Sequence, residues 1–276
     1  MESHFFENSR ILSKLKEKTS VPAIKITPSQ KGHLSIFQSK FGGVPYWNLN
    51  KPYPVSSDGK KLVLLAQLNM EEVPPLDDFP MSGILQFFIS QGNMYGLDFS
   101  NQTKQDFWRV VYHEKVSAAV TENSVLDLGI PVSYSLGTDE IFPFSEEFAL
   151  SFQKTETFLG IQSYDRFMNV LKELGKECGV DFPDDFDPYE SFGESFGNEV
   201  SNCNVGHWLG GYPNFMQEDP RNLGHECDTL LFQMDSDSVG NSGIMWGDMG
   251  TANFFISKDA LLRCDFSKVL YNWDCC

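Results

Sequence analysis

The sequence has no long apolar run and little positive charge. Its longest apolar stretches, such as Leu62–Leu68, are far shorter than the about 20 residues that a membrane-spanning helix needs. Lys and Arg number 21 against 38 Asp and Glu, which gives a formal net charge of −17 at pH 7. Because contacts to phosphate require a positive surface, we expect no binding to nucleic acid. We expect no membrane association either.

A secretory leader and a disulfide scaffold are also missing. No basic segment followed by an apolar one occurs near the start of the sequence. Six cysteines are few for 276 residues, and a chain of this length can build its own core without covalent links. We therefore expect reduced thiols and a cytoplasmic location. The cysteines are Cys178, Cys203, Cys227, Cys264, Cys275 and Cys276.

Familiar catalytic motifs are absent. The sequence has no phosphate-binding glycine loop, dinucleotide fingerprint, zinc-protease motif or kinase signature. Gly193–Gly197 matches the Gly-x-Ser-x-Gly nucleophile elbow, but Asp184–Tyr189 before it cannot form the central strand that the elbow requires. We interpret Gly193–Gly197 as an acidic loop. No catalytic residue and no cofactor are assigned, and we favour a protein that is not an enzyme.

Apolar periodicity predicts an α+β fold. Aromatic residues make up 14% of the chain, and short apolar runs bounded by turn residues are typical of buried strands. We expect a largely antiparallel sheet with a few flanking helices. Strands are predicted at Val21–Ile26, Lys61–Leu68 and Gly83–Ile89, with one or two within Phe107–Val120. Helices are predicted at 4–18 and after an N-cap at Ser163, ending at Gly175 or Gly179.

Three short motifs occur twice in the same order. Their offsets are 168, 166 and 167 residues. We infer a duplicated unit of about 50 residues at 41–90 and 209–257. Since a solenoid needs at least three repeats, we expect the copies to form one pseudo-twofold core in a single domain spanning 1–276. The pairs are Gly42–Tyr46 with Gly210–Pro213, Leu64–Leu68 with Leu230–Met234, and Phe87–Ser90 with Phe254–Ser257.

Gln67 and Gln233 occupy the same place in the two copies. Each lies within an apolar run that predicts a buried strand. A buried amide must be hydrogen-bonded. We therefore predict a structural role, in which each glutamine bonds backbone groups of the Gly-Gly-Pro loop in its own copy.

The second copy also carries a group of carboxylates. Asp235, Asp237 and Asp248 lie within 14 residues, and His207 precedes them. The spacing excludes an EF-hand, because Trp246 stands where the bidentate Glu belongs. We predict that at least two carboxylates converge, either on backbone N–H groups of the Trp246–Gly247 turn or on Ca²⁺ or Mg²⁺. The backbone alternative is favoured because Asp in glycine-rich turns commonly bonds its own main chain.

A second possible metal site combines Cys203, His207, His225 and Cys227. All four are zinc-capable side chains. Neither half contains the C-x2–4-C pair of standard zinc sites, so we favour core cysteines and loop histidines and assign no metal.

The negative charge is concentrated in the later part of the chain. Residues 1–90 carry 10 basic and 8 acidic side chains, whereas residues 91–276 carry 11 and 30. Glu177–Asp228 holds twelve carboxylates and one cation, Arg221. This pattern is typical of a solvated acidic face, and a docking surface for a basic partner or a cation site are the alternatives.

Several motifs together resemble the YwqG-like family of bacterial proteins, over residues of about 20–276. The resemblance implies a cytosolic α+β protein, and it implies no catalytic residues. Some members of that family have been placed among candidate immunity proteins of polymorphic toxin systems. The motifs are Gly42–Trp47, Leu65–Asn69, Gly83–Phe88, His207–Pro213, Gln233–Asp237 and Trp246–Gly250.

Together these observations favour a cytosolic, non-catalytic interaction protein of the immunity type. Its acidic surface would dock on a basic protein partner. One alternative stays open, namely an enzyme or a small-ligand or cation binder with a site between the two repeat copies. Such a site would use His207, Asp235, Asp237 and Asp248.

Overall fold

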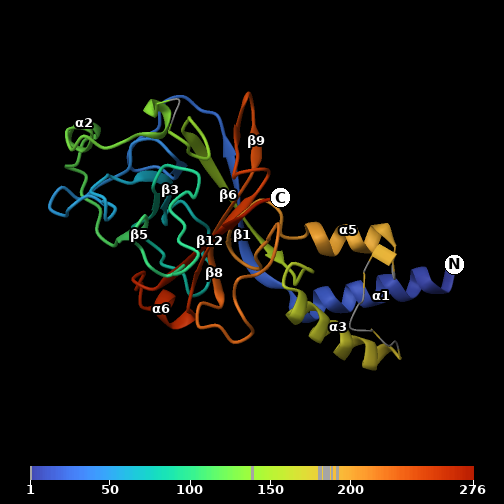
Figure 1. Ribbon diagram of the computed structural model, residues 1–276. Coiled ribbons are helices and arrows are strands. Elements are labelled where there is room, and N and C mark those ends of the chain that lie inside the picture. The colour runs from blue at the N-terminus through green and yellow to red at the C-terminus, as the bar shows by residue number, and fades with distance from the viewer. Residues whose placement is uncertain (1, 138–139, 180–181, 183–186, 188, 191–192) are drawn as a thin grey trace.

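The computed structural model describes residues 2–137, 140–179, 182, 187, 189–190 and 193–276 (Figure 1). Ten strands of this part form one sheet, in the order β12-β11-β8-β7-β1-β6-β2-β3-β4-β5. Neighbouring strands are antiparallel throughout. The prediction of an α+β fold with a largely antiparallel sheet is therefore confirmed. The elements are α1 (Glu2–Thr19), β1 (Val21–Ser29), β2 (Lys40–Phe41), β3 (Val63–Asn69), β4 (Ile84–Ile89), β5 (Trp108–His113), α2 (Glu122–Leu126), the 3₁₀ helix η1 (Ser133–Ser135), β6 (Phe148–Thr157), α3 (Tyr164–Cys178), α5 (Glu194–Asn202), β7 (His207–Gly210), β8 (Thr229–Asp235), β9 (Asp237–Val239), β10 (Ser242–Ile244), β11 (Thr251–Ile256), α6 (Lys258–Leu262) and β12 (Val269–Asp274).

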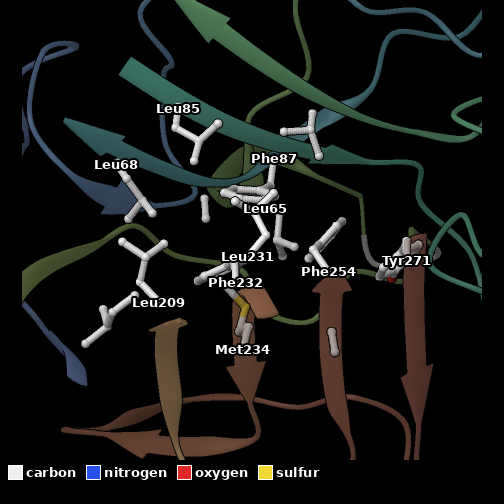
Figure 2. Packing of buried hydrophobic residues seen from close by; sticks show 14 of the residues in the cluster. Leu65, Leu68, Leu85, Phe87, Leu209, Leu231, Phe232, Met234, Phe254 and Tyr271 are labelled. Atoms are coloured by element: carbon white, nitrogen blue, oxygen red, sulfur yellow. The ribbon is translucent and has the colours of Figure 1, made fainter. Parts of the chain in front are cut away.

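The main core lies between the two halves of this sheet. Figure 2 shows side chains of β3 and β4 facing those of β7, β8, β11 and β12. The Phe87 ring lies 4.6 Å from that of Phe232 and 4.9 Å from that of Phe254, measured between centroids. Strands β3 and β4 are buried on both faces, because a second cluster that includes Leu64 and Phe88 covers their other side. This two-sided burial explains why their sequences are nearly continuous apolar runs.

The two ends of the sheet approach one another across the core. The ring of Trp108 in β5 lies 5.4 Å from that of Tyr271 in β12. The Tyr271 N–H donates to the carbonyl oxygen of Gln102, just before β5, at 3.0 Å. The sheet is therefore curled until it is nearly closed, and its first and last strands are covered rather than left open.

Helices α1, α3 and α5 form an arm beside the sheet, on the right of Figure 1. Their apolar faces meet in a separate cluster that includes Leu15, Leu171 and Val200. Lysines of α1 bind glutamates of the other two helices. The pairs are Lys14–Glu177 at 3.0 Å, Lys18–Glu173 at 2.7 Å, and Lys16–Glu199.

Both predicted helices are present. Helix α3 follows Ser163 and ends at Gly179, whose φ of +75° is a left-handed conformation that glycine adopts without strain. The interpretation of Gly193–Gly197 as a loop is wrong, because helix α5 begins at Glu194. Phe196 and Val200 are one helical turn apart and pack into the arm, and this tertiary contact outweighs the glycines.

The interval Asp235–Asp248 contains the β9–β10 hairpin. The hairpin packs against the end of β1, where the Asn241 N–H donates to Gln30 at 3.5 Å. In contrast, Phe107–Val120 contains one strand, β5. No helix among the described residues is both long enough and apolar enough to cross a membrane.

Candidate functional site

His207 is the first residue of β7, and its side chain is 2% exposed. Strand β7 lies between β1 and β8, which brings the ring to the start of the β9 hairpin. Its Nδ1 accepts the Asp235 N–H at 3.1 Å, so the proton of the neutral ring is on Nε2. Nε2 lies 3.3 Å from Asp237 Oδ2. This hydrogen bond from His207 lowers the pKa of the Asp237 carboxyl.

Asp235, the last residue of β8, is 5% exposed, and its carboxylate accepts three hydrogen bonds. Oδ2 accepts the Gly206 N–H at 2.8 Å. Oδ1 accepts the Ser236 N–H at 2.9 Å and the Thr251 hydroxyl at 2.7 Å. Asp235 therefore fixes the connection between β8 and its neighbours, and both of its carboxylate oxygens accept hydrogen bonds.

Asp248 is exposed, on the turn that follows Trp246. The prediction that the carboxylates converge on the Trp246–Gly247 turn is wrong. The Trp246 N–H donates to Ser236 Oγ at 3.0 Å, and the Gly247 N–H donates to the Tyr95 hydroxyl at 3.4 Å. Ser236 and Tyr95 thus occupy the donors that were expected to receive carboxylates.

Cys203, His225 and Cys227 do not join His207 in a metal site. Cys203 lies against the arm and contacts the carbonyl oxygen of Phe158, and burial raises its pKa to about 12. Cys227 packs in a different apolar cluster, and its N–H donates to His225 Nδ1 at 3.0 Å. In the part of the chain that the structure describes, no three His, Cys, Asp or Glu side chains are grouped to hold a metal ion.

The buried amides of Gln67 and Gln233 each bond three backbone groups. Gln67 Oε1 accepts the Tyr46 N–H at 2.8 Å, and Gln233 Oε1 accepts the Asn214 N–H at 2.7 Å. Tyr46 and Asn214 directly follow the two Gly-Gly-x-Pro segments. The Nε2 groups donate to the carbonyl oxygens of Ile36 and Gln38, and of Asn204 and Gly206, at distances of 2.7–2.8 Å.

A second pair of buried amides was not predicted from the sequence. Gln86 Nε2 donates to the carbonyl oxygen of Tyr46 at 2.6 Å, and Asn253 Nδ2 donates to that of Asn214 at 2.8 Å. Both amides lie in apolar strands, 167 residues apart. The same repeat offset could have identified them, but their different residue types concealed the match.

Two buried basic residues were also missed. His113 in β5 is 2% exposed, and burial lowers its pKa to about 4. Lys40 in β2 has no exposed surface, and its Nζ lies 3.9 Å from Glu147 Oε2. Burial lowers the Lys40 pKa to about 8. The residues next to His113 and Lys40 in the sequence do not predict that these side chains are buried. The segments that cover them come from distant parts of the chain.

A cavity of about 560 Å³ lies between the beginning of α3 and the loop after β7. The Arg166 guanidinium lies 5.2 Å over the ring of Tyr212 beside it. Arg221 is fixed by Asp219, which accepts from Nε at 2.9 Å and from Nη2 at 2.8 Å. The lining is strongly polar and comprises Ile161–Arg166, Gln217–Asp219, Arg221–His225 and Asp228. It contains none of the predicted residues His207, Asp235, Asp237 and Asp248.

These features define an α+β protein with a curled antiparallel sheet, in which His207, Gln233 and Asp235 are held by internal hydrogen bonds. The chain belongs to the family described as domain of unknown function DUF1963, whose sequence profile matches residues 39–275. The matched range starts after β1 and includes all the candidate site residues. No curated protein shows a significant match to the chain.

Proposed function

We propose that this protein is a non-catalytic binding protein whose acidic surface docks on a basic segment of another protein. The observation that carries the proposal is the net charge of −19 on residues 91–276. Among the described residues, only three of these carboxylates, Glu173, Glu177 and Glu199, are paired with lysines of α1. Lys14, Lys16 and Lys18 bind glutamates within the helical arm, and Lys40 is buried. These cations therefore do little to offset acidic residues elsewhere on the surface.

The hydrogen bonds of His207 and Asp235 support a binding role rather than a catalytic one. A nucleophile or general base needs a free lone pair within reach of a substrate. Asp235 bonds three donors, and His207 is held between the Asp235 N–H and Asp237. The resemblance to the YwqG-like family of bacterial proteins is consistent with an immunity-type role, in which a cytoplasmic protein docks on a basic toxin.

The proposal is tested by affinity capture with a tagged chain and with a variant that carries Glu218→Gln, Glu226→Gln and Asp228→Asn. All three positions are exposed. Quantitative mass spectrometry should find a basic protein that the wild type captures and the variant captures less well, because long-range attraction speeds docking. Partners that are acidic, or that both proteins capture equally, would contradict the proposal.

The cavity favours a second candidate, a small-ligand binding protein. Its lining offers the guanidinium of Arg166 together with the carboxylate of Asp165, which suits a small zwitterion. A thermal-shift screen of free amino acids tests this candidate, because a ligand bound only by the native state raises the midpoint. Arg166→Gln should abolish any shift. Glu17→Gln, an exposed change on α1, is the control.

We also propose that residues 41–90 and 209–257 are two copies of one unit within a single domain. Support comes from the strand order, in which β2-β3-β4-β5 at one end mirrors β7-β8-β11-β12 at the other. The matched hydrogen bonds of Gln67 and Gln233 are further support.

A further inference from the structure

Four exposed apolar side chains lie on three neighbouring loops. Met94, Ile141, Met245 and Met249 are 42%, 43%, 46% and 54% exposed. Hydrogen bonds join the loops that carry them. The carbonyl oxygen of Ile141 accepts the Gly92 N–H at 2.9 Å, and the Met245 N–H donates to the carbonyl oxygen of Pro143 at 2.8 Å. We call these four residues the methionine patch.

The methionine patch stands on a rigid aromatic base. The ring of Tyr95 lies 5.0 Å from that of Trp246 and 4.9 Å from that of Trp273. Trp273 Nε1 donates to the carbonyl oxygen of Met94 at 2.8 Å, which ties the first loop to β12. Met249 has a φ of +59°, a conformation unusual for a residue with a side chain. Such backbone conformations often occur at functional sites.

Exposed acidic residues lie close along the chain to residues of the methionine patch, or on a neighbouring loop. Glu140 precedes Ile141, and Asp248 precedes Met249, and both are exposed. The carbonyl oxygen of Asp248 accepts the Cys276 N–H at 3.3 Å. The loop that carries Glu218 lies next to this segment, because Gln217 Nε2 donates to the carbonyl oxygen of Cys275 at 2.8 Å. The apolar centre is therefore accompanied by three carboxylates.

We propose that the methionine patch and these carboxylates dock a basic amphipathic segment of another protein. Methionine side chains are flexible and polarisable, so they adapt to apolar side chains of different shapes. The rim of Glu140, Asp248 and Glu218 then binds Lys or Arg on the flanks of that segment. This inference rests on the proposed function, and it adds both the location of the contact and an apolar component.

Charge argues against two other occupants of the methionine patch. A second copy of the chain would bring an equally acidic rim against this one, and each copy carries a net charge of −17. An anionic membrane would be repelled in the same way. A basic partner is the occupant whose charge complements the rim.

The test uses a fluorescein-labelled 18-residue peptide of leucine and lysine, with leucines at helical i, i+3, i+4 and i+7 spacing. A second peptide of the same composition has its leucines scattered so that no apolar face forms. Fluorescence anisotropy measures the binding of both to the wild type, to Met245→Ser/Met249→Ser, to Asp248→Asn/Glu218→Gln and to Met81→Ser. Met81 is the matched control, since it is 60% exposed and lies in the loop before β4.

We expect the wild type to bind the amphipathic peptide at least about tenfold more tightly than the scattered peptide. The methionine double variant should lose about tenfold in affinity, whereas Met81→Ser should bind like the wild type. All variants alter exposed side chains and should keep the wild-type melting temperature.

Three results would overturn the inference. In the first, the two peptides bind equally, and Asp248→Asn/Glu218→Gln weakens binding while Met245→Ser/Met249→Ser does not. The docking surface would then act through charge alone. This result would support docking on a basic partner and would reject the methionine patch as the apolar contact. No binding of either peptide at low salt would count against both. A dimer in analytical ultracentrifugation that Met245→Ser/Met249→Ser dissociates would identify a second copy as the occupant.

Discussion

At the scale of single residues, buried amides hold the loops that follow β2 and β7. Gln67→Leu and Gln233→Leu should each destabilise the fold, because each change leaves one backbone N–H and two carbonyl oxygens without their partner. The expected loss is about 1–3 kcal/mol for each unsatisfied group. Urea denaturation measures it. Gln153→Leu, on the exposed face of β6, is the control and should change stability by less than about 0.5 kcal/mol. A loss no larger than that of the control would refute this role of the amides.

His113 predicts a dependence of stability on pH. Its pKa is lowered from 6.5 to about 4 in the folded state, chiefly by burial. Between these two pH values the unfolded chain binds the proton and the folded protein does not, so stability falls as the pH falls below 6.5. Relative to His113→Gln, the wild type should lose about 2 kcal/mol between pH 7 and pH 5. Urea melts at the two pH values provide the measurement, and parallel losses in both proteins would contradict it.

At the scale of elements, the arm formed by α1, α3 and α5 depends on apolar contact more than on its ion pairs. Leu171 is fully buried in the arm, so Leu171→Ala should cost about 2–5 kcal/mol. Lys14 and Glu177 are 32% and 50% exposed, and Lys14→Gln should cost less than about 1 kcal/mol because solvent screens such pairs. Chemical denaturation of the two variants measures both changes. Equal losses would show that the ion pairs are as important as the apolar contacts.

The elements that could be predicted from the sequence are those whose signals are local. Strands β3 and β4 appear as apolar runs between turn residues, and α3 has its helical spacing and its terminal Gly179 within one segment. Helix α5 was missed because its glycines suggest a loop, and the contact of Phe196 with distant helices decides the outcome. Locally encoded elements were predictable, whereas elements stabilised by tertiary packing were not.

The candidate site was less predictable than the fold. The proximity of His207 to Asp237 depends on how β7 pairs with β1 and β8, and no local pattern encodes that pairing. Asp248 is close to Asp237 in sequence. After the β9–β10 hairpin, however, Asp248 lies on an exposed turn, whereas Asp237 contacts His207. The sequence could identify polar residues near strand ends. It did not show that Asp235 bonds Gly206, 29 residues away, or that Asp237 bonds His207, 30 residues away.

At the scale of the whole molecule, we propose that the uneven distribution of charge serves docking on a basic partner. Three lysines of α1 are paired with glutamates within the arm, while acidic residues outnumber basic ones in the chain as a whole. Attraction between opposite charges acts mainly on the rate of association, and salt weakens it. Contacts made only after docking affect chiefly the rate of dissociation.

The most direct test of the central claim is therefore the association rate constant of the captured partner, measured by stopped-flow fluorescence at 50 and 500 mM NaCl. For docking on an acidic surface, we expect the rate constant to fall by about tenfold or more at the higher salt concentration. The Glu218→Gln/Glu226→Gln/Asp228→Asn variant should associate more slowly at low salt and show a weaker salt dependence. A rate constant that is the same at both salt concentrations would contradict the account.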